Sequence, residues 1–352
     1  MFDLFSDHQL VTGIGLLGGI LLGLAARLGR FCTLGAIEDL LYGDSSQRMR
    51  MWGLAIGTAI IGSFTLIGLG LFDASHSFYL SVRWMPMASI IGGLMFGYGM
   101  ALSGNCGYGA IARLGGGDLR SFVIVLVMGI STYVVLSGPL APLRNLLFQQ
   151  QDVTSELPPG LAHHLAALTH LPLAGIGIVV GVLLIGISLW DADFRRDRKS
   201  LFWSVIVGVA VVSGWAGTAY INARGFEALP VVSHSFSAPL GETILWTMTG
   251  SLRPLSFAVG SITGVWLGAF IGSLIKGHFR WEACDDPREL RRQIIGAAIM
   301  GAGAVVAMGC TVGQGLSAFS LLSLSAPVTF LAIFAGAALG LRQLIEGFRR
   351  TT

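Results

Sequence analysis

The stretch that decides the fold is IIGGLMFGYGMALSGNCGYG, residues 90–109. It is an apolar run without a charged residue, studded with glycines and ending on a cysteine turn. The second half of the chain holds a similar stretch, IIGAAIMGAGAVVAMGCTVGQG, at residues 294–315. Runs of this length can cross roughly 30 Å of hydrocarbon, and small residues let membrane helices pack closely. The two stretches therefore predict a membrane protein built from two related halves.

The composition of the chain agrees with this interpretation. Hydrophobic residues make up 53% and charged residues 12% of the 352 positions, and 50 positions are glycine. A soluble globular chain of this composition would lack the polar residues needed to cover its surface. The formal net charge of +3 gives no sign of nucleic-acid binding. Four dispersed cysteines are too few for a disulfide framework.

We predict an all-α polytopic membrane protein with about nine transmembrane helices, none of which contains Asp, Glu, Lys or Arg. These spans lie at about 9–26, 51–72, 86–103, 121–138, 172–190, 201–221, 255–275, 293–308 and 326–341. The first span has no basic segment before it, so we expect it to stay in the mature protein rather than to be cleaved as a signal peptide.

Four shorter Gly-rich stretches, at about 31–43, 105–116, 237–250 and 309–320, are too short to span and too apolar for ordinary loops. We interpret them as re-entrant helices whose irregular backbone the protein buries. Interfacial loops are the open alternative.

The order of these segments predicts an inverted pseudo-two-fold repeat. Each half reads as span, short segment, span, span, short segment, span, and an additional span inserts the second half upside down. Within one integral membrane domain of residues 1–352, the first half covers 1–138 and the inverted second half covers 201–352. A connection with the linking span covers 139–200. Such repeats place the substrate path of transporters at their interface.

Basic residues then orient the predicted protein. With nine crossings, 18 of the 22 Lys and Arg residues fall on one face, while Arg83, Arg144, Arg224 and Arg253 fall on the other. The positive-inside rule makes the richer face cytoplasmic. We therefore expect a multi-pass protein of the bacterial inner membrane with a periplasmic N-terminus and a cytoplasmic C-terminus.

Three of the four cysteines share the pattern C-x-x-G at the start of a short segment. The three motifs are Cys32-Thr33-Leu34-Gly35, Cys106-Gly107-Tyr108-Gly109 and Cys310-Thr311-Val312-Gly313. A single buried cysteine usually acts as a small hydrophobe, but shared motif and position favour a function. We assign no function to Cys284, which lies in a charged loop.

Thiols at helix starts suit a soft, sulfur-containing anion. Helix N-termini attract anions, glycines admit close backbone approach, and a thiol offers a weak donor with a polarizable sulfur. The candidate substrate path comprises the cysteines, their motif glycines and three polar neighbours: Cys32, Cys106, Cys310, Gly35, Gly109, Gly313, Asn105, Thr311 and Gln314.

Other uses of these residues stay open at this point. Thiolates also bind soft metals, but no CxxC pair and no histidine within the membrane accompanies the three cysteines. An intramembrane thiol redox enzyme is a further alternative. Glu38 and Glu242 occupy corresponding places in the two halves, as interfacial charges or as proton-coupling groups. We expect no catalytic residues, no metal and no cofactor.

At GRFCTLGAIEDL, SGNCGYGAIARLGGGDLRS and GCTVGQGL the chain resembles the YeeE/YedE family of bacterial sulfur-transport membrane proteins. The resemblance implies thiosulfate uptake through nine spans and re-entrant helices that form an hourglass. It also implies that Cys32, Cys106 and Cys310 relay the anion by S–H···S contacts without covalent chemistry. A small cytoplasmic sulfur-carrier protein is the implied partner. Relatives linked to selenium or other sulfur species leave the substrate open among these.

Overall fold

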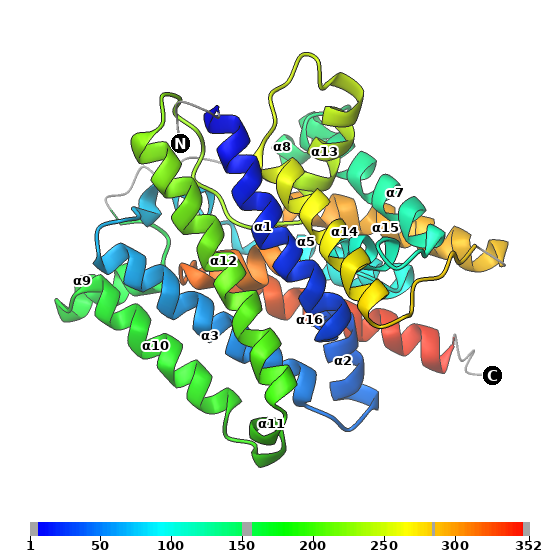
Figure 1. The fold of residues 1–352 in the computed structure, drawn as a ribbon, viewed down its shortest axis with the longest axis horizontal. Coiled ribbons are helices and arrows are strands. Elements are labelled where there is room, and N and C mark those ends of the chain that lie inside the picture. Colours follow the sequence, from blue (N-terminus) through cyan, green and yellow to red (C-terminus); the bar gives the residue numbers. More distant parts are fainter. Residues whose placement is uncertain (1–5, 150–156, 284–285, 348–352) are drawn as a thin grey trace.

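The computed structural model describes residues 6–149, 157–283 and 286–347. Within these ranges the regular structure is helical and no strand is present, which confirms an all-helical protein (Figure 1). Long helices occupy the nine predicted places. They are α1 (Asp7–Leu28), α3 (Gln47–Gly68), α5 (Pro86–Ser103), α7 (Leu119–Leu136), α10 (Leu173–Ser188), α12 (Arg198–Arg224), α14 (Phe257–Ile275), α15 (Pro287–Val306) and α16 (Ser325–Glu346).

Seven helical segments among the described residues are long and apolar enough to cross a membrane, so the chain is a multi-pass membrane protein by length and composition. Two of the predicted spans are not among the seven. Helix α10 has 16 residues, and α15 begins with the charged sequence PRELRR.

Short helices begin at the four predicted places. They are α2 (Thr33–Tyr42), α6 (Gly107–Leu114), α13 (Ala238–Thr249) and η2 (Gly313–Ala318), the last a π-helical turn flanked by α-helical residues. The remaining elements are η1 (Ala74–His76), α4 (Phe78–Ser81), α8 (Ala141–Leu147), α9 (Leu161–Thr169) and α11 (Ala192–Arg196). Cys284 lies outside the described residues, as do Arg349 and Arg350, two of the 18 basic residues assigned above to the cytoplasmic face.

Helices α1 and α14 run side by side in the same direction and pack through glycines (Figure 1). A Cβ atom added at Gly15 would lie 2.5 Å from the carbonyl oxygen of Phe257. Gly19 and Gly23 meet the α14 backbone in the same way, and Gly260, Gly264 and Gly268 meet that of α1. Two small-xxx-small rows thus bring the helix backbones into direct contact, as the high glycine content predicted.

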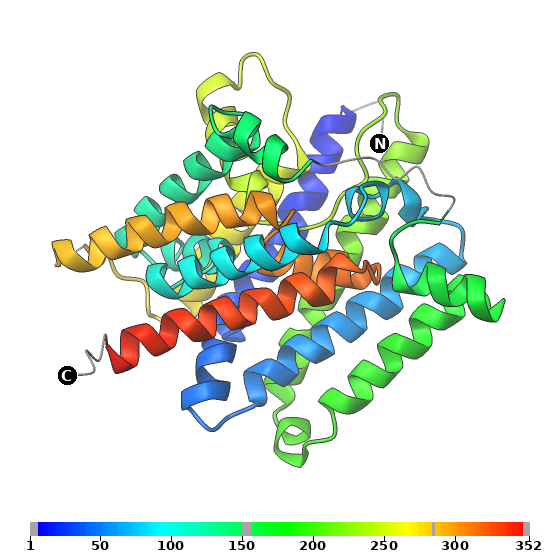
Figure 2. The same ribbon diagram turned by 180° about the vertical axis from the view of Figure 1, so that it is seen from behind.

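The stretch quoted at the outset forms most of α5 and the start of α6. Helix α5 lies between α15 and α16 (Figure 2). Gly99 of α5 and Gly296 of α15 each face the other's backbone, and a Cβ at Gly99 would lie 2.5 Å from the Gly296 carbonyl oxygen. The two glycine-rich stretches that predicted related halves are therefore packed directly against each other.

Helix α3 packs between α10 and α12, and α1 packs on α12 as well as on α14. The short helices fill the interior between these groups: α6 contacts α7 and α14, while η2 contacts α16, α3 and α12. One large cluster of buried apolar side chains joins them. The long helices thereby hold the starts of α6 and η2 inside the protein.

Candidate functional site

Each of the three C-x-x-G motifs follows a left-handed turn. The residue two positions before the cysteine has positive φ in every case: 57° at Arg30, 74° at Gly104 and 56° at Met308. A left-handed residue is a common way to end a helix, and it costs roughly 1–2 kcal/mol where the residue is not glycine. The turn ends the long helix and redirects the chain into the short one.

The cysteine then stands at the start of the short helix. The sulfur of Cys106 accepts a hydrogen bond from the backbone N–H of Gly109 at 3.4 Å, and that of Cys310 accepts one from Gly313 at 3.3 Å. A side chain that accepts from the third helical N–H is an N-cap. The spacing C-x-x-G therefore places the glycine amide against the thiol. Cys32 begins α2 without such a bond.

Cys310 has the most extensive set of contacts among the three thiols. Its sulfur also accepts from the backbone N–H of Phe236 at 3.2 Å, and the Ser235 hydroxyl lies 3.8 Å away. Both residues belong to the segment before α13. The sequence analysis did not select this segment, although its run of small polar residues, SHSFS, stands directly before a short helix.

We expected no histidine within the membrane beside the cysteines, but the described core contains one, two positions before Phe236. This residue, His234, is completely buried. Its Nδ1 lies 2.7 Å from the Ser261 hydroxyl, its carbonyl oxygen accepts from Ser317, and its Nε2 has no hydrogen-bond partner among the described residues. The segment before α13 enters the core as irregular chain, which hydropathy alone does not reveal.

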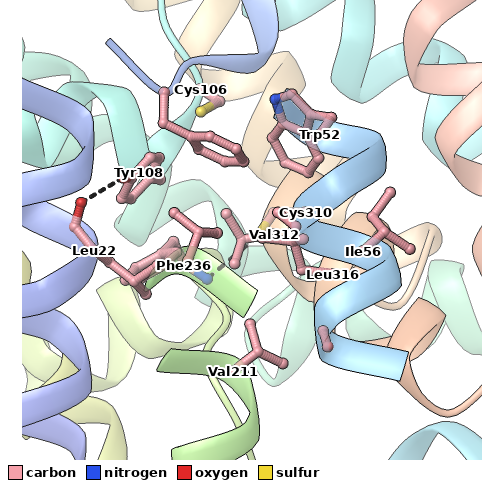
Figure 3. Close-up of a cluster of buried hydrophobic side chains, with 14 of the residues drawn as sticks. Leu22, Trp52, Ile56, Cys106, Tyr108, Val211, Phe236, Cys310, Val312 and Leu316 are labelled. Atoms are coloured by element: carbon pink, nitrogen blue, oxygen red, sulfur yellow. Dashed lines mark hydrogen bonds between the residues drawn. The ribbon is translucent and has the colours of Figure 1, made fainter. Parts of the chain in front are cut away.

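The thiols lie in one apolar cluster. Cys106 and Cys310 are buried in it beside Trp52, Phe236 and Tyr108, whose hydroxyl donates to the Leu22 carbonyl oxygen at 2.6 Å (Figure 3). Cys32 is half-buried and packs against the same cluster. Cys106 lies near Cys32, and Thr311, the residue after Cys310, is buried against the Cys106 thiol. We therefore place Cys106 between the other two thiols.

On the Cys310 side the cluster faces a cavity of about 410 Å³, named here the Cys310-side cavity. Around the thiol it is lined by Tyr79, Ser235, Ser237, Met308 and Gly309, and further out by His8, Glu242 and Ser256. Its described lining contains no Lys or Arg. It lies where α1 and α14 begin.

The Cys32-side cavity, of about 380 Å³, lies where α1 and α14 end. It is lined by Cys32, Asn105 and Gly109 together with several charged residues, namely Arg27, Arg30, Arg48, Arg113, Lys276 and Glu38. Because α1 has 22 residues at 1.5 Å each, the two cavities open about 30 Å apart.

The polar candidates differ in how their side chains are used. Asn105 is buried and lines the Cys32-side cavity. Thr311 is buried against the Cys106 thiol, but its hydroxyl makes no hydrogen bond of standard geometry with a described residue. Gln314 donates to the carbonyl oxygens of Ala307 and Met308, both at 3.1 Å, and accepts from Ser325. Its amide therefore holds the end of α15.

The motif glycines also differ. A Cβ at Gly313 would lie 2.7 Å from the Ser235 hydroxyl, and one at Gly35 would collide with Arg48. A Cβ at Gly109 would meet nothing closer than 3.6 Å. Gly313 is thus required by packing. At Gly35 only the flexible end of Arg48 would have to move, and Gly109 has room for a methyl group. Of the two carboxylates singled out, Glu242 lines the Cys310-side cavity and Glu38 the Cys32-side cavity.

Comparison with known proteins agrees with this architecture. Residues 28–339 match the family model described as sulphur transport. The chain is 25% identical to the thiosulfate transporter TsuA of Escherichia coli over 320 residues, covering 86% of each chain. It is 26% identical to TsuA of Spirochaeta thermophila over 327 residues, covering 88% of this chain and 92% of that one. A probable transporter, YedE of Salmonella typhimurium, is 27% identical over 106 residues, 30% of this chain and 25% of that one.

Proposed function

The chain belongs to the sulphur transport family, and from that premise we propose that it takes up thiosulfate, or a related small sulfur anion, across the bacterial inner membrane. One observation carries the proposal: three C-x-x-G thiols meet in one apolar cluster between two cavities that lie at opposite ends of α1 and α14. The relatives that match most of the chain are named thiosulfate transporters, not enzymes.

The proposed path leads from the Cys310-side cavity past Cys310, Cys106 and Cys32 into the Cys32-side cavity. The sulfur atoms of Cys310 and Cys106 are occupied as acceptors for backbone N–H groups, so their S–H protons are free to point toward a passing anion. The helix starts beside them add donor dipoles without a fixed charge. Weak donors let a dianion bind and then leave, with no covalent step.

Gly313, Gly35 and Gly109 accompany the thiols, each in the proposed role of admitting the anion close to the backbone. Thr311 and Asn105 are proposed as additional donors along the path. The Thr311 hydroxyl makes no hydrogen bond of standard geometry with a described residue, and Asn105 lines a cavity. Gln314 takes a positioning role, since it fixes the turn that carries Cys310.

We further propose nine spans, with α2, α6, α13 and η2 re-entrant, in an inverted repeat of residues 1–138 and 201–352 joined by 139–200. The helix contacts support this arrangement. Helix α1 packs on α14 as α12 packs on α3, α5 packs on α16 as α15 packs on α7, and α6 packs on α7 as η2 packs on α16. Exchanging the halves converts each contact into the other, as a pseudo-two-fold axis requires.

The proposed orientation has a periplasmic N-terminus and a cytoplasmic C-terminus. Its support is the gathering of Arg27, Arg48, Arg113 and Lys276 around one cavity. Uptake then moves two negative charges against the membrane potential, which costs about 2 × 2.3 kcal/mol per 100 mV. This corresponds to roughly a thousandfold gradient at 1.4 kcal/mol per tenfold. Either a coupling ion or rapid consumption in the cytoplasm, for instance by a sulfur-carrier protein, must supply that free energy.

The proposal is tested in a bacterium that lacks its own thiosulfate and sulfate uptake systems and is given thiosulfate as sole sulfur source. We expect growth, and uptake of ³⁵S-labelled thiosulfate, to depend on this protein and to fail for Cys106→Ala and Cys310→Ala. Cys284→Ala is the matched control and should grow normally. Absence of growth with the protein present in the membrane would contradict thiosulfate as the substrate and direct the search to other sulfur or selenium anions.

A further inference from the structure

The Cys32-side cavity contains an excess of positive charge beside a thiol. Five cationic side chains line it, namely Arg27, Arg30, Arg48, Arg113 and Lys276, against the single carboxylate of Glu38. The neutral side chains of Cys32 and Asn105 complete the inner wall. A cavity of about 380 Å³ is large enough for a small oxyanion with some of its water.

Four of the five cations have no ion-pair partner among the described residues. Arg48 pairs with Asp39 at 3.0 Å, but no described carboxylate lies within 4.0 Å of Arg27, Arg30, Arg113 or Lys276. Arg27 instead donates to the Ser273 hydroxyl at 2.6 Å, and Lys276 donates to the Arg27 carbonyl oxygen. These neutral contacts fix the direction of the two side chains. Asp118 and Glu282 act on Arg27 only from beyond ion-pair distance, so its charge is only partly compensated.

The cations also repel one another. Lys276 follows the last residue of α14, and burial together with Lys199, Arg30 and Arg27 lowers its pKa. Clustered, partly desolvated cations that outnumber the nearby carboxylates are a costly arrangement that a bound anion relieves. Arginine is also well suited to oxyanions, because its planar group presents several donors at once.

We propose that the Cys32-side cavity is a binding site for a small oxyanion of charge −2, held by Arg27, Arg30 and Lys276 next to the Cys32 thiol. Anion binding at this site does not depend on transport, whereas its role as the last binding site before cytoplasmic release rests on the proposed function. The Cys310-side cavity, whose described lining has no Lys or Arg, offers no comparable site. An anion leaving the thiols would thus meet an attractive potential on this side alone.

Charge-selective modification of Cys32 tests the proposal without any transport. The purified full-length protein in detergent is treated with an anionic or a cationic methanethiosulfonate reagent, and labelling of the Cys32 peptide is followed by mass spectrometry. The ratio of the two rates reports the local potential, because thiol ionisation affects both rates alike. We expect the anionic reagent to react faster.

Arg30→Gln is the first variant, because Arg30 makes no hydrogen bond or ion pair with a described residue and its loss should spare the packing. We expect each neutralised cation to lower the rate ratio roughly three- to tenfold at 0.1 M salt. Arg342→Gln is the matched control, since Arg342 is exposed, pairs with Glu346 at 3.0 Å and lies outside the cavity. Arg27→Lys, which keeps the charge, should largely preserve the ratio.

Sodium sulfate is the binding probe, as a dianion that does not consume the reagents. We expect it to protect Cys32 from both reagents, and sodium chloride of equal ionic strength to protect much less. If the two salts slow Cys32 labelling equally, the effect is ionic screening only and the proposed site is wrong. The proposed site is also wrong if the ratio of labelling rates is unchanged both in Arg30→Gln and in a variant with Arg27 and Lys276 replaced by Gln. Because thiosulfate is not used, failure of the growth test leaves this result unaffected.

Discussion

The surroundings of Cys310 and Cys32 differ in what holds the thiol. Cys310 is buried and its sulfur accepts from two backbone N–H groups, those of Gly313 and Phe236. Cys32 is half-buried, has no cap hydrogen bond, and faces a cavity lined by cations. The first thiol is held by backbone N–H groups in an uncharged environment, and the second has no such hydrogen bond and lies near charge. On the proposed path, recognition by dipoles and attraction by charge would therefore lie at opposite ends.

This difference has a physical reason in the cost of desolvation. A cation buried beside Cys310 would bind a dianion tightly within the apolar cluster and hinder its onward movement. At the Cys32 end water screens the charges, so the same cations attract the anion and still release it. The following changes separate the two ends.

The largest effect is expected for Gly313→Ala. The new Cβ would lie 2.7 Å from the Ser235 hydroxyl and 3.1 Å from that of Tyr79, so the segment that supports Cys310 must shift. We expect ³⁵S-thiosulfate uptake per membrane-inserted protein to fall at least about tenfold, by analogy with losses caused by misplaced groups in active sites.

Gly109→Ala is the matched substitution at Cys106. Its Cβ would lie 3.6 Å from Asn105 and 3.7 Å from the Cys106 sulfur, which is ordinary contact. Uptake should fall less than in Gly313→Ala, because no protein group must move and only the space for the anion beside the backbone is reduced. Equal losses in both variants would show that the two motifs need glycine for the substrate rather than for packing.

A smaller effect, on the stability of the protein, is expected when Cys310→Ser is compared with Cys32→Ser. Serine places its oxygen closer to the backbone than cysteine places its sulfur, so the two N–H groups that converge on Cys310 lose good geometry. We expect Cys310→Ser to destabilise the protein by about 1 kcal/mol per weakened hydrogen bond. Cys32→Ser should leave stability unchanged, because no such bond exists there. Thermal unfolding in detergent, followed by tryptophan fluorescence, compares the two variants. Identical midpoints would contradict the conclusion that backbone N–H groups stabilise Cys310 but not Cys32.

Much of this architecture could be predicted from the sequence. Nine uncharged apolar runs and four short Gly-rich stretches gave the positions of the helices, because hydrophobic length is a strong signal for spans. The C-x-x-G spacing likewise marked the short helix starts at Cys106 and Cys310. In both, the glycine N–H reaches the thiol three residues earlier.

Other parts depend on contacts that no local pattern carries. His234, Ser235 and Phe236 lie in irregular chain, and only tertiary packing brings them to Cys310. The left-handed turns at Arg30 and Met308 occur at residues that rarely adopt such φ values. The excess charge of the Cys32-side cavity was also hidden, since the positive-inside rule assigns basic residues to a face and not to a cavity.

The smallest effect on stability, and the finest test of the comparison, comes from Thr311→Val and Thr33→Val. Each threonine follows a cysteine, is buried, and has a hydroxyl without a hydrogen-bond partner among the described residues. An unsatisfied buried hydroxyl costs about 1–3 kcal/mol, so its replacement by the isosteric valine should leave thermal stability unchanged or raised.

Thr311 lies against Cys106, in the uncharged part of the path, whereas Thr33 begins the helix beside the cationic cavity. We therefore expect Thr311→Val to lower thiosulfate uptake several-fold by raising KM, because few other donors surround the anion there. Thr33→Val should have a weaker effect, since Arg27 and Arg30 supply attraction at that end. The reverse order, with Thr33→Val the more damaging, would mean that the anion depends on hydroxyl donors where charge is available. The division between dipoles and charges would then be wrong.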